Sequence, residues 1–543
     1  MINPVKSKWL ALIARKYLNK YEAVEDSGAR KAPEIERGGE ERILKAYDRL
    51  KAIAIGRNLE RNSSKAITLI EQVKVLTAGK VKAQFNLPDE QNGATDWNKK
   101  ASHLFNVEFA RDCFYSDPMN FTEFVQLVIA AIIREGDLLI VFDSGIFGGS
   151  GKLFAFEADQ IVNVIETEWR NHEINTEWGY QKDIGGGKTE WTPYPQNSGV
   201  ITDQYGKTIG YIVSNVTLPE DKQRGTTAIP YHDAVIIPAD SCRLAMRRFR
   251  HSQKRGIASF LPIENELSDS EAMRKMELMT AKKASQTLAF VEHSKETTQA
   301  AQAVDFAKIA ELMEASKAEP ADAESADGTV TSETKTLKRY RNFEELLGGA
   351  VEYGEEGDKM NYLQPQRPNM DVPSFYDHCG DTAGASLGLA SSYTRMKVNN
   401  SYTGHRGEML LTMAHIKNRQ KLAEWCFLDW IAEKVIRWYI KQGKINDPGN
   451  DWQTLISWDY PVIPYIDPQK DIASDASALK TGKTTFRKLL GPSWREQLEE
   501  LARELEVIRE KKLPLNILET VAGAAAAGAN TADDKTAETT EEK

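Results

Sequence analysis

The sequence predicts an α+β fold, in which helices and antiparallel strands form separate groups instead of alternating along the chain. Residues 121–134 carry a wide apolar face at helical spacing, and Gly136 signals the end of that helix. The apolar runs at 137–143 and 153–156 flank a glycine-rich turn, a pattern typical of a β-hairpin. Further runs that indicate strands lie at 199–203, 208–213 and 234–237. Residues 105–250 are therefore expected to hold a mostly antiparallel sheet.

Helices are also predicted before this region. Residues 40–55 and 64–78 repeat apolar side chains at helical spacing. The Asn-Ser-Ser sequence at 62–64 is a helix start signal, because such side chains accept a hydrogen bond from a free N–H of the first turn. Residues 79–100 show neither the helical nor the strand period, so we expect a loop there.

The C-terminal half is predicted to be mainly helical, with helices at 264–291, 371–390 and 494–511. The second of these begins at Asp-Val-Pro, which places a capping residue and a proline in the first turn. The strongest amphipathic pattern spans 408–440, whereas residues 452–466 are expected to be irregular. The apolar positions of the 408–440 helix are Leu410, Met413, Ile416, Leu422, Trp425, Leu428, Ile431, Val435 and Trp438.

Composition limits the classes of protein that this chain can belong to. Apolar residues make up 41% and charged residues 27% of 543 residues, which is an ordinary globular balance for two to four domains. No apolar run of about 18 residues occurs, so no transmembrane helix is expected. The four cysteines are widely spaced and predict reduced thiols in the cytosol. The net charge of −9 argues against tight binding of nucleic acid by the whole chain.

Motifs for catalysis, nucleotides or metals are missing from the sequence. Each Gly-Lys pair lacks the glycine five positions earlier that a phosphate-binding loop needs. His378 and Cys379 are adjacent on a predicted helix, so their side chains point apart and do not suggest a metal site. The pair Glu355 and Glu356 is better explained as a solvated turn than as nuclease ligands. We expect no enzyme activity, no metal and no cofactor.

Two polar segments remain as candidate contact sites. Residues 243–255 (RLAMRRFRHSQKR) are the most basic part of the chain. They are either a solvated surface segment or a patch for a phosphate backbone or an acidic neighbouring subunit. Residues 391–407 are rich in Asn, Ser, Tyr and basic residues and are expected to form a flexible loop between two helices. Such a loop presents side chains to a partner that is touched without being held tightly.

Several blocks of the sequence, in the same order, resemble the portal proteins of tailed bacteriophages, in the lambda-type branch. The blocks are GRNLERNSSKAITLIEQVKVLTAGKVKAQ (56–84), IREGDLLIVF with FAFEADQIVN (133–163), GVITDQYGKTIGYIV (199–213), RHSQKRGIASFLPI (250–263), NNSYTGHRGEML (399–410) and, more weakly, YIDPQKDIASDASALKTGKTTFRKLL (465–490). Two departures occur: Thr77-Ala78-Gly79 stands where relatives often have two glycines, and Thr403-Gly404 shifts the register of the fifth block.

The resemblance implies a portal-type fold, with an α/β wing, a helical stem, a small α/β clip and a helical crown, that assembles as a ring of commonly twelve subunits. On this chain it implies an N-terminal helical arm at 1–89, a wing at 90–261, a first stem helix at 262–292, a clip with a low-complexity insertion at 293–370, a second stem helix at 371–390, a tunnel loop at 391–407, a long wing and tunnel helix with a return segment at 408–485, a crown helix at 486–520 and a disordered tail at 521–543.

The resemblance also implies a function. The ring would lie at one capsid vertex, in the virion and, during assembly, in the host cytoplasm, as the channel for DNA packaging and ejection. Its partners would be other copies of itself, double-stranded DNA, the terminase large subunit, the major capsid and scaffold proteins and the head-completion or connector proteins, with no membrane. The expected DNA-facing residues of the tunnel loop are Arg395, Lys397, Asn399, Asn400, Tyr402, His405 and Arg406.

Sliding DNA needs a channel lining that does not bind phosphates strongly, since affinity rises steeply with the number of phosphate contacts. The acidic chain and the small number of cations in 391–407 fit that need. Two other classes remain open: an enzyme of the packaging machinery, such as a nuclease or ATPase, and an unrelated cytosolic adaptor. ATP hydrolysis by the purified chain would indicate the first, and a persistent monomer would indicate the second.

Overall fold

The computed structural model describes residues 44–88, 93–185, 188–215, 224–286, 290–292, 359–361, 371–398, 401–449, 452–461 and 468–511. The chain divides into two units: unit 1 combines Met1–Glu264 with Gly384–Lys543, and unit 2 is Asn265–Ala383. About half of the predicted arm at 1–89 (residues 1–43 and 89), most of the predicted clip and the whole tail at 521–543 lie outside the described residues. None of the helices in the described ranges is both long enough and apolar enough to span a membrane.

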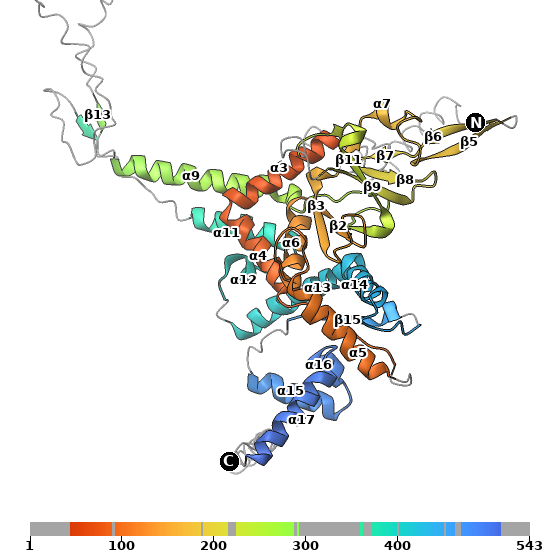
Figure 1. The fold of residues 1–543 in the computed structure, drawn as a ribbon. Helices are drawn as coiled ribbons and strands as arrows, with labels where there is room; N and C mark the ends of the chain where they lie inside the picture. The colour runs from red at the N-terminus through yellow and green to blue at the C-terminus, as the bar shows by residue number, and fades with distance from the viewer. Residues whose placement is uncertain are drawn as a thin grey trace, which may run out of the picture. The chain divides into compact units, whose positions relative to one another are not determined.

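Three helices of unit 1 pack against one another (Figure 1). Their bounds are α3 (Ala46–Asn62), α4 (Ser64–Ala78) and α6 (Phe121–Arg134). The Ser63 hydroxyl accepts a hydrogen bond from the Ala66 N–H at 3.4 Å, so the predicted cap at 62–64 is confirmed. The predicted helices at 64–78 and 121–134 are confirmed with the same limits. The helix expected at 40–55 instead begins and ends later, because its apolar face continues to Leu59.

The predicted hairpin is the centre of a three-stranded antiparallel sheet with the order β12-β2-β3. Its strands are β2 (Asp137–Phe142), β3 (Leu153–Glu157) and β12 (Cys242–Met246). Every residue of β2 is buried, because strands flank it on both sides and helix α6 precedes it. Strand β12 occupies the start of the basic run at 243–255, for which no strand was predicted from the sequence.

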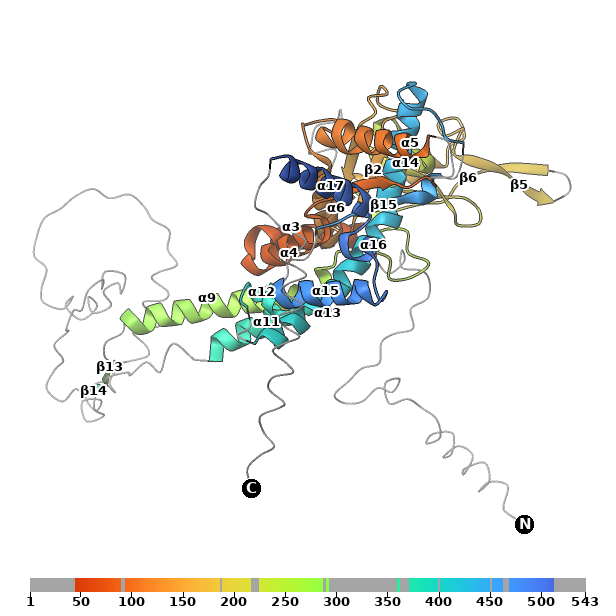
Figure 2. The ribbon, with the colours of Figure 1, turned by 90° about the horizontal axis from the view of Figure 1, so that it is seen from below.

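A second antiparallel sheet has the order β11-β9-β8-β7. The predicted mostly antiparallel arrangement is confirmed, but the strands form several small sheets instead of one. Leu139 and Phe156 of the first sheet share one apolar core with Val213 and Ile237 of the second. The hairpin β5–β6 projects from this region (Figure 1 and Figure 2). The strands are β4 (Asn163–Val164), β5 (Gly179–Gly185), β6 (Lys188–Pro193), β7 (Gln196–Asn197), β8 (Val200–Thr202), β9 (Thr208–Ser214), β10 (Ala228–Ile229) and β11 (Ala234–Pro238), and the short helix α7 (Glu166–Trp169) follows β4.

A pair of short strands joins distant parts of unit 1, where loops were predicted. Strand β1 (Lys82–Phe85) pairs with β15 (Ile456–Asp459), and α5 (Ala94–His103) continues into the π-helical η2 (Leu104–Phe109). The predictions of a loop at 79–100 and of an irregular segment at 452–466 are therefore wrong for these elements. Aromatic rings hold the elements together, since Phe85 lies 6.0 Å from Trp97 and 6.2 Å from Trp452, ring centre to ring centre.

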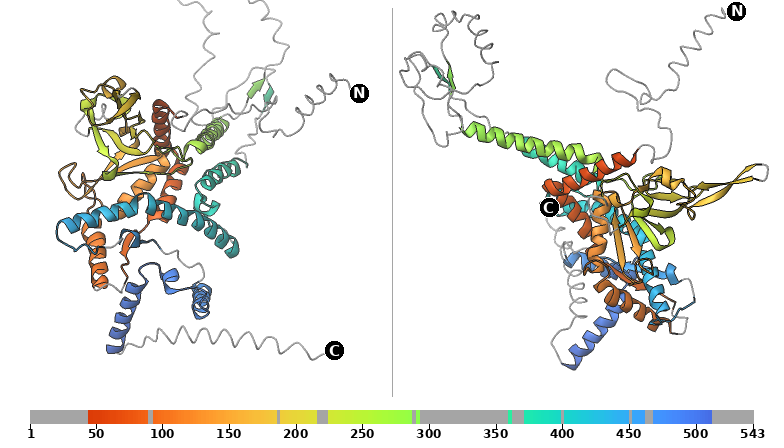
Figure 3. Two further views of the ribbon diagram at one scale, coloured as in Figure 1. Left: turned by 90° about the vertical axis from the view of Figure 1, so that its right-hand side faces the viewer. Right: turned by 45° about the horizontal axis from the view of Figure 1, so that its top comes forward.

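The predicted 408–440 helix is longer and contains an irregular turn. Helix α13 (Tyr402–Ala423) continues through the π-helical η9 (Glu424–Leu428) into α14 (Asp429–Lys441), and the three run on as one rod (Figure 3). The π turn adds one residue and shifts the faces of the two halves relative to each other. Ile431 and Val435 are fully buried, whereas Leu410, Leu422 and Trp425 are 61%, 46% and 73% exposed. The single apolar face predicted from the sequence is thus wrong at these three positions.

The C-terminal part of unit 1 contains α15 (Pro468–Lys480), α16 (Phe486–Leu490) and α17 (Trp494–Glu510). The predicted helix at 494–511 is confirmed as α17. Unit 2 contains most of α9 (Glu264–Gln286), the antiparallel pair β13 (Phe290–Glu292) and β14 (Lys359–Asn361), and most of α11 (Asp371–Ser386). Helix α11 starts at Asp371, as the Asp-Val-Pro signal predicted.

Candidate functional site

The segment 391–407 is partly helical, so the prediction of a loop throughout is wrong. Helix α12 (Ser391–Arg395) begins the segment, and Met396 ends it with a left-handed backbone (φ 51°). Helix α13 then starts at Tyr402, because the Ser401 hydroxyl accepts a hydrogen bond from the Gly404 N–H at 3.4 Å and caps the helix. Asn399 and Asn400 lie outside the described residues.

Neighbouring helices hold α12 in place. The Ser392 N–H donates to Glu408 Oε2 at 3.2 Å, which ties the start of α12 to α13. The Gln72 side-chain amide donates to the Met396 sulfur at 2.9 Å, which ties the end of α12 to α4. These two contacts fix both ends of α12 against neighbouring helices.

Tyr402 and Arg406 are brought together on the first turns of α13. Arg406 donates to the Tyr402 hydroxyl at 3.1 Å and forms an ion pair with Asp471 of α15 at 3.0 Å. The hydrogen bond with Tyr402 and the charge of Asp471 raise the pKa of Arg406. Lys470 of α15 lies 5.7 Å from the centre of the Tyr402 ring. The charge of Arg406 is thus balanced inside the subunit.

The other candidates of this segment lie apart from that contact. Lys397 is exposed and forms no ion pair with any other described residue. Its neighbours Met396 and Val398 are 68% and 65% exposed. His405 is half-buried, and its Nδ1 has no hydrogen-bond partner within the described ranges. Arg395 is exposed at the end of α12. Lys397 is therefore the unbalanced cation of the segment that a partner can approach most directly.

A second cluster lies in the middle of unit 1, where Arg57 of α3 donates to three carboxylates. Its Nη1 and Nη2 lie 2.9 Å from Asp159 and Glu157, and its Nε lies 3.1 Å from Glu135. Arg224 donates to Glu157 and, at 3.2 Å, to Asp159. The cluster joins the end of α6 and the end of β3 to α3, which lies far earlier in the sequence. We call these five residues the Arg57 cluster.

In the Arg57 cluster, burial and the neighbouring charges shift the pKa values in opposite directions. Burial lowers the pKa of Arg57, but the hydrogen bonds and charges of Asp159 and Glu135 outweigh it and raise the pKa above its usual value. Burial likewise raises the pKa of Asp159, and the hydrogen bond and charge of Arg57 outweigh it and lower the pKa. Both groups are therefore ionised at neutral pH.

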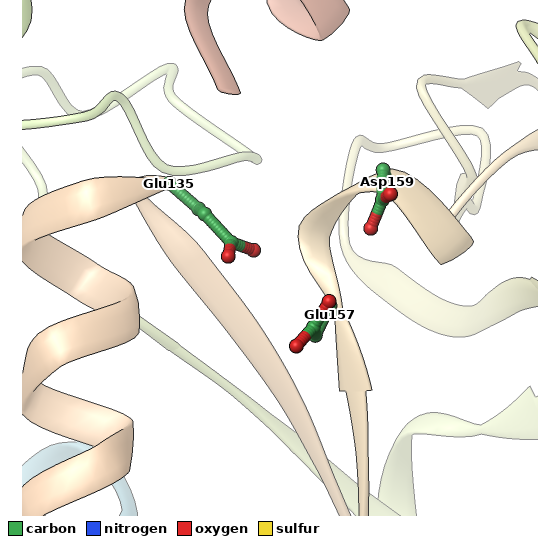
Figure 4. A group of neighbouring side chains, drawn as sticks. All are labelled: Glu135, Glu157 and Asp159. Carbon is green, nitrogen blue, oxygen red and sulfur yellow. The ribbon is translucent and has the colours of Figure 1, made fainter. Parts of the chain in front are cut away.

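The same three carboxylates have the spacing of a possible metal site, which was not predicted from the sequence. Glu135, Glu157 and Asp159 point toward one another, with ligand oxygens within 4.8 Å (Figure 4). The Arg57 guanidinium donates to all three, so it already supplies the positive charge that a cation would bring. The arrangement is explained as an ion-pair network that joins three elements.

Arg255 forms another ion pair of unit 1 and, unlike Arg57, is fully buried. Its side chain is 0% exposed and forms two hydrogen bonds with Asp137, at 2.7 and 3.0 Å. Its remaining N–H groups donate to the carbonyl oxygens of Ala158, Ile161 and Ser198 at 2.8, 3.2 and 2.5 Å. The alternatives for the basic run, a solvated segment or an exposed patch, are thus wrong for Arg255, because a buried carboxylate and three carbonyls surround it.

Close backbone contacts explain three glycines beside these arginines. A Cβ on Gly56 would lie 1.9 Å from the Arg134 carbonyl oxygen, and one on Gly256 would lie 2.0 Å from that of Gly136. Gly136 itself has a φ of 102°, which favours glycine. The Gly256 N–H also donates to Asp137 at 2.7 Å. Helix α3, the end of α6 and the segment after Arg255 therefore meet backbone against backbone.

In the sequence these residues belong to separate blocks, and the contacts between them were not predicted. Gly56 and Arg57 belong to the block at 56–84, Glu135 and Asp159 to that at 133–163, and Arg255 to that at 250–263. A glycine next to a charged residue in each block was the available signal. Which charge pairs with which depends on contacts between residues about a hundred positions apart, which spacing alone does not reveal.

The sequence profile of the family described as phage portal protein, lambda family, matches residues 28–420. This range is well over half of the chain, and the chain belongs to that family. The match includes the Arg57 cluster, the Arg255 pair and the segment 391–407. No curated protein sequence matches the chain.

Three solved structures of gene transfer agent particles are similar to this chain. They are the neck of an empty particle computed with C6 symmetry, the virion of a native particle, and the neck of a native particle computed with C12 symmetry. In each case the TM-score is 0.44 and the sequence identity is 9%, over 81% of this chain and 93% of the matched chain.

Proposed function

We propose that this chain is one subunit of a portal ring, a structural and non-enzymatic conduit through which double-stranded DNA enters and leaves a phage-type capsid. The observation that supports this best is membership of the lambda-type portal family over residues 28–420. The ring contains twelve copies of the chain, lies at one vertex of the virion and is assembled in the host cytoplasm.

The parts of the portal map onto the elements in the following way. The sheets of unit 1 belong to the wing, α9 and α11 are the two stem helices, and α17 belongs to the crown. The segment between the stem helices, which includes β13 and β14, is the clip. We propose that the terminase motor docks at the clip and that capsid, scaffold and head-completion proteins contact the outside of the ring.

The stretch from Arg395 to Arg406 is proposed to face the DNA. Lys397 has no ion-pair partner among the described residues, whereas Arg406 already pairs with Asp471. One exposed lysine per subunit gives weak contacts with the phosphate backbone that do not depend on base sequence. DNA can then slide past, because few counterions are released at any one position of the duplex.

Replacing the unbalanced polar groups of this stretch tests the proposal. The triple variant Lys397→Ala, Asn399→Ala and Asn400→Ala is expected to assemble like the wild type but to package or retain less DNA, by about tenfold or more. Lys417→Ala, which removes an exposed lysine further along on α13, is the matched control and is expected to behave like the wild type. DNA packaging and retention are measured in particles assembled with each variant.

Two results contradict the proposal in different ways. If the triple variant packages and retains DNA at the wild-type level, the stretch does not contact the DNA. If the purified chain hydrolyses ATP, it is an enzyme of the packaging machinery instead of a passive conduit.

A further inference from the structure

A cavity of ≈ 420 Å³ lies inside unit 1, apart from the Arg57 cluster and the segment 391–407. Helix α13, the π turn η9, the end of β12 and the turn after α11 surround it. Part of its wall is apolar, formed by Ile129, Ile132 and Phe427 among others. Three arginines also line it: Arg247, Arg248 and Arg419.

The positive charge of this cavity is not balanced within the described part of the subunit. No aspartate or glutamate is among the residues that line it. Arg247, Arg248 and Arg419 form no ion pair with any described residue. Arg419 donates to the Leu387 carbonyl oxygen at 2.9 Å, and Arg247 stacks 4.8 Å from the centre of the Phe249 ring. Neither contact supplies a negative charge.

Arg419 shows the energetic consequence of this arrangement. Its burial and the nearby charge of Arg247 lower the pKa of Arg419 to about 10, so it is still charged at neutral pH. Two like charges share a partly dehydrated space, which destabilises the empty cavity. An anion that entered the cavity would offset the repulsion and would replace the interactions with water that the arginines lose.

The shape and lining of the cavity indicate which anion fits. The apolar wall continues to the rim, where Trp425 is 73% and Leu422 is 46% exposed. Only the phosphates and sugars of duplex DNA could enter such a recess, and these polar groups would not pack against its apolar wall. A peptide that carries a carboxylate beside an apolar side chain matches both the arginines and the wall, and exposed Trp and Arg are typical of protein interfaces.

We propose that this cavity receives an acidic, partly apolar segment of a second copy of this chain. Each chain has a net charge of −9, so neighbouring copies repel each other unless cations on one meet carboxylates on the next. The cavity offers three such cations at one place. This inference rests on the proposed ring, and it assigns one of the contacts between adjacent subunits.

Charge reversal at the cavity tests the inference. The double variant Arg247→Glu and Arg248→Glu keeps the backbone contact of Arg419 and reverses two of the three charges. Lys480→Glu with Lys483→Glu is the matched control, because it changes the net charge equally at exposed residues without ion pairs in the described ranges. Assembly is measured by mass photometry over a range of concentrations, and circular dichroism verifies that each variant is folded.

We expect the control to assemble like the wild type and the cavity variant to need at least tenfold more protein to assemble. If wild type, control and cavity variant all form rings equally well, the inference is wrong and the proposed ring stands. If the cavity variant assembles normally but loses DNA packaging, the cavity binds nucleic acid and the inference is also wrong. If the wild type forms no ring under any condition, both the inference and the proposed function are wrong.

A second measurement needs no change at the arginines. Cys426 lines the cavity and is partly exposed, whereas Cys113, Cys242 and Cys379 are 0%, 1% and 6% exposed. Cys426 should therefore be the described thiol that reacts first with a small maleimide. We expect this reaction to be at least tenfold slower in assembled rings than in isolated subunits at the same pH. Equal rates would show that no neighbour covers the cavity.

Discussion

Two arginines with many acceptors hold the centre of unit 1 together. Arg57 bridges three carboxylates, and Arg255 combines one buried carboxylate with three carbonyl oxygens. A buried charge is tolerated only when its hydrogen bonds and its counter-charge replace the lost water. Each arginine therefore fixes the geometry of several elements at once, and its removal leaves charged or polar groups without partners.

Replacing Arg57 tests this role at the level of one residue. Arg57→Met keeps much of the side-chain volume but leaves Glu135, Glu157 and Asp159 facing one another with less positive charge. We expect the free energy of unfolding at pH 7 to fall by about 3 kcal/mol, the scale for breaking a buried ion pair. Arg61→Met, at an exposed position one turn later, is expected to change it by less than about 0.5 kcal/mol.

The pH dependence separates a charge effect from a packing effect in this variant. In the wild type the lowered pKa of Asp159 contributes stability above its usual value of about 3.9, and this stability is lost as the pH falls through the folded-state pKa. In Arg57→Met the crowded carboxylates should have raised pKa values, so protonation restores stability as the pH falls. Urea unfolding should show a smaller difference in the free energy of unfolding between the two proteins at pH 5 than at pH 7.5. An equal difference at both pH values would indicate a packing effect alone.

At the residue scale, the sequence predicts local chemistry better than long-range pairing. The cap at Ser63 was predictable because donor and acceptor lie three residues apart. The burial of Arg255 was not, because its run of basic residues looks like a solvent-exposed surface and its partner Asp137 lies 118 positions earlier. Arg406 was predicted to face the DNA, but its ion pair with Asp471 was not predicted, because Asp471 lies on a separate helix.

At the scale of elements, length and periodicity decided what could be predicted. Helices α4 and α6 have long, regular apolar patterns, and both were predicted with the limits that the structure shows. Strands β1 and β15 were missed because each has four residues and is defined by pairing with the other, more than 350 positions away. The π turn η9 was missed because a sequence pattern assumes an unbroken helical period.

The close approach of α3 to the end of α6 gives a prediction for two glycines in helices. Alanine usually stabilises a helix by up to about 1 kcal/mol relative to glycine. Gly407→Ala in α13 should show that gain, since a Cβ there meets nothing within 4 Å. Gly56→Ala should instead lower the free energy of unfolding by about 2 kcal/mol or more, because its Cβ would collide with the Arg134 carbonyl oxygen.

Thermal or urea unfolding of the two glycine variants provides the comparison. The two substitutions are chemically identical and both lie inside a helix, so the difference between them reports the helix contact alone. A stabilised Gly56→Ala variant would contradict the backbone contact between α3 and the carbonyl of Arg134.

At the scale of the whole molecule, several features of the subunit remain unexplained until copies of it meet. Leu410 and Leu411 of α13 and Trp425 of η9 are 61%, 67% and 73% exposed. The cavity arginines lack counter-charges in the described part of the chain. Large exposed apolar side chains on one long helical rod, with unbalanced cations beside them, are typical of a surface that another chain covers. A ring in which each subunit contacts two neighbours accounts for these features together.

Electron microscopy of the purified full-length chain, alone and assembled with its capsid, tests the central claim most directly. The account predicts closed rings with an open centre wide enough for a DNA duplex, about 20 Å or more across. Particles that are solid in the middle, or a chain that stays a monomer at every concentration and also within the capsid, would contradict it.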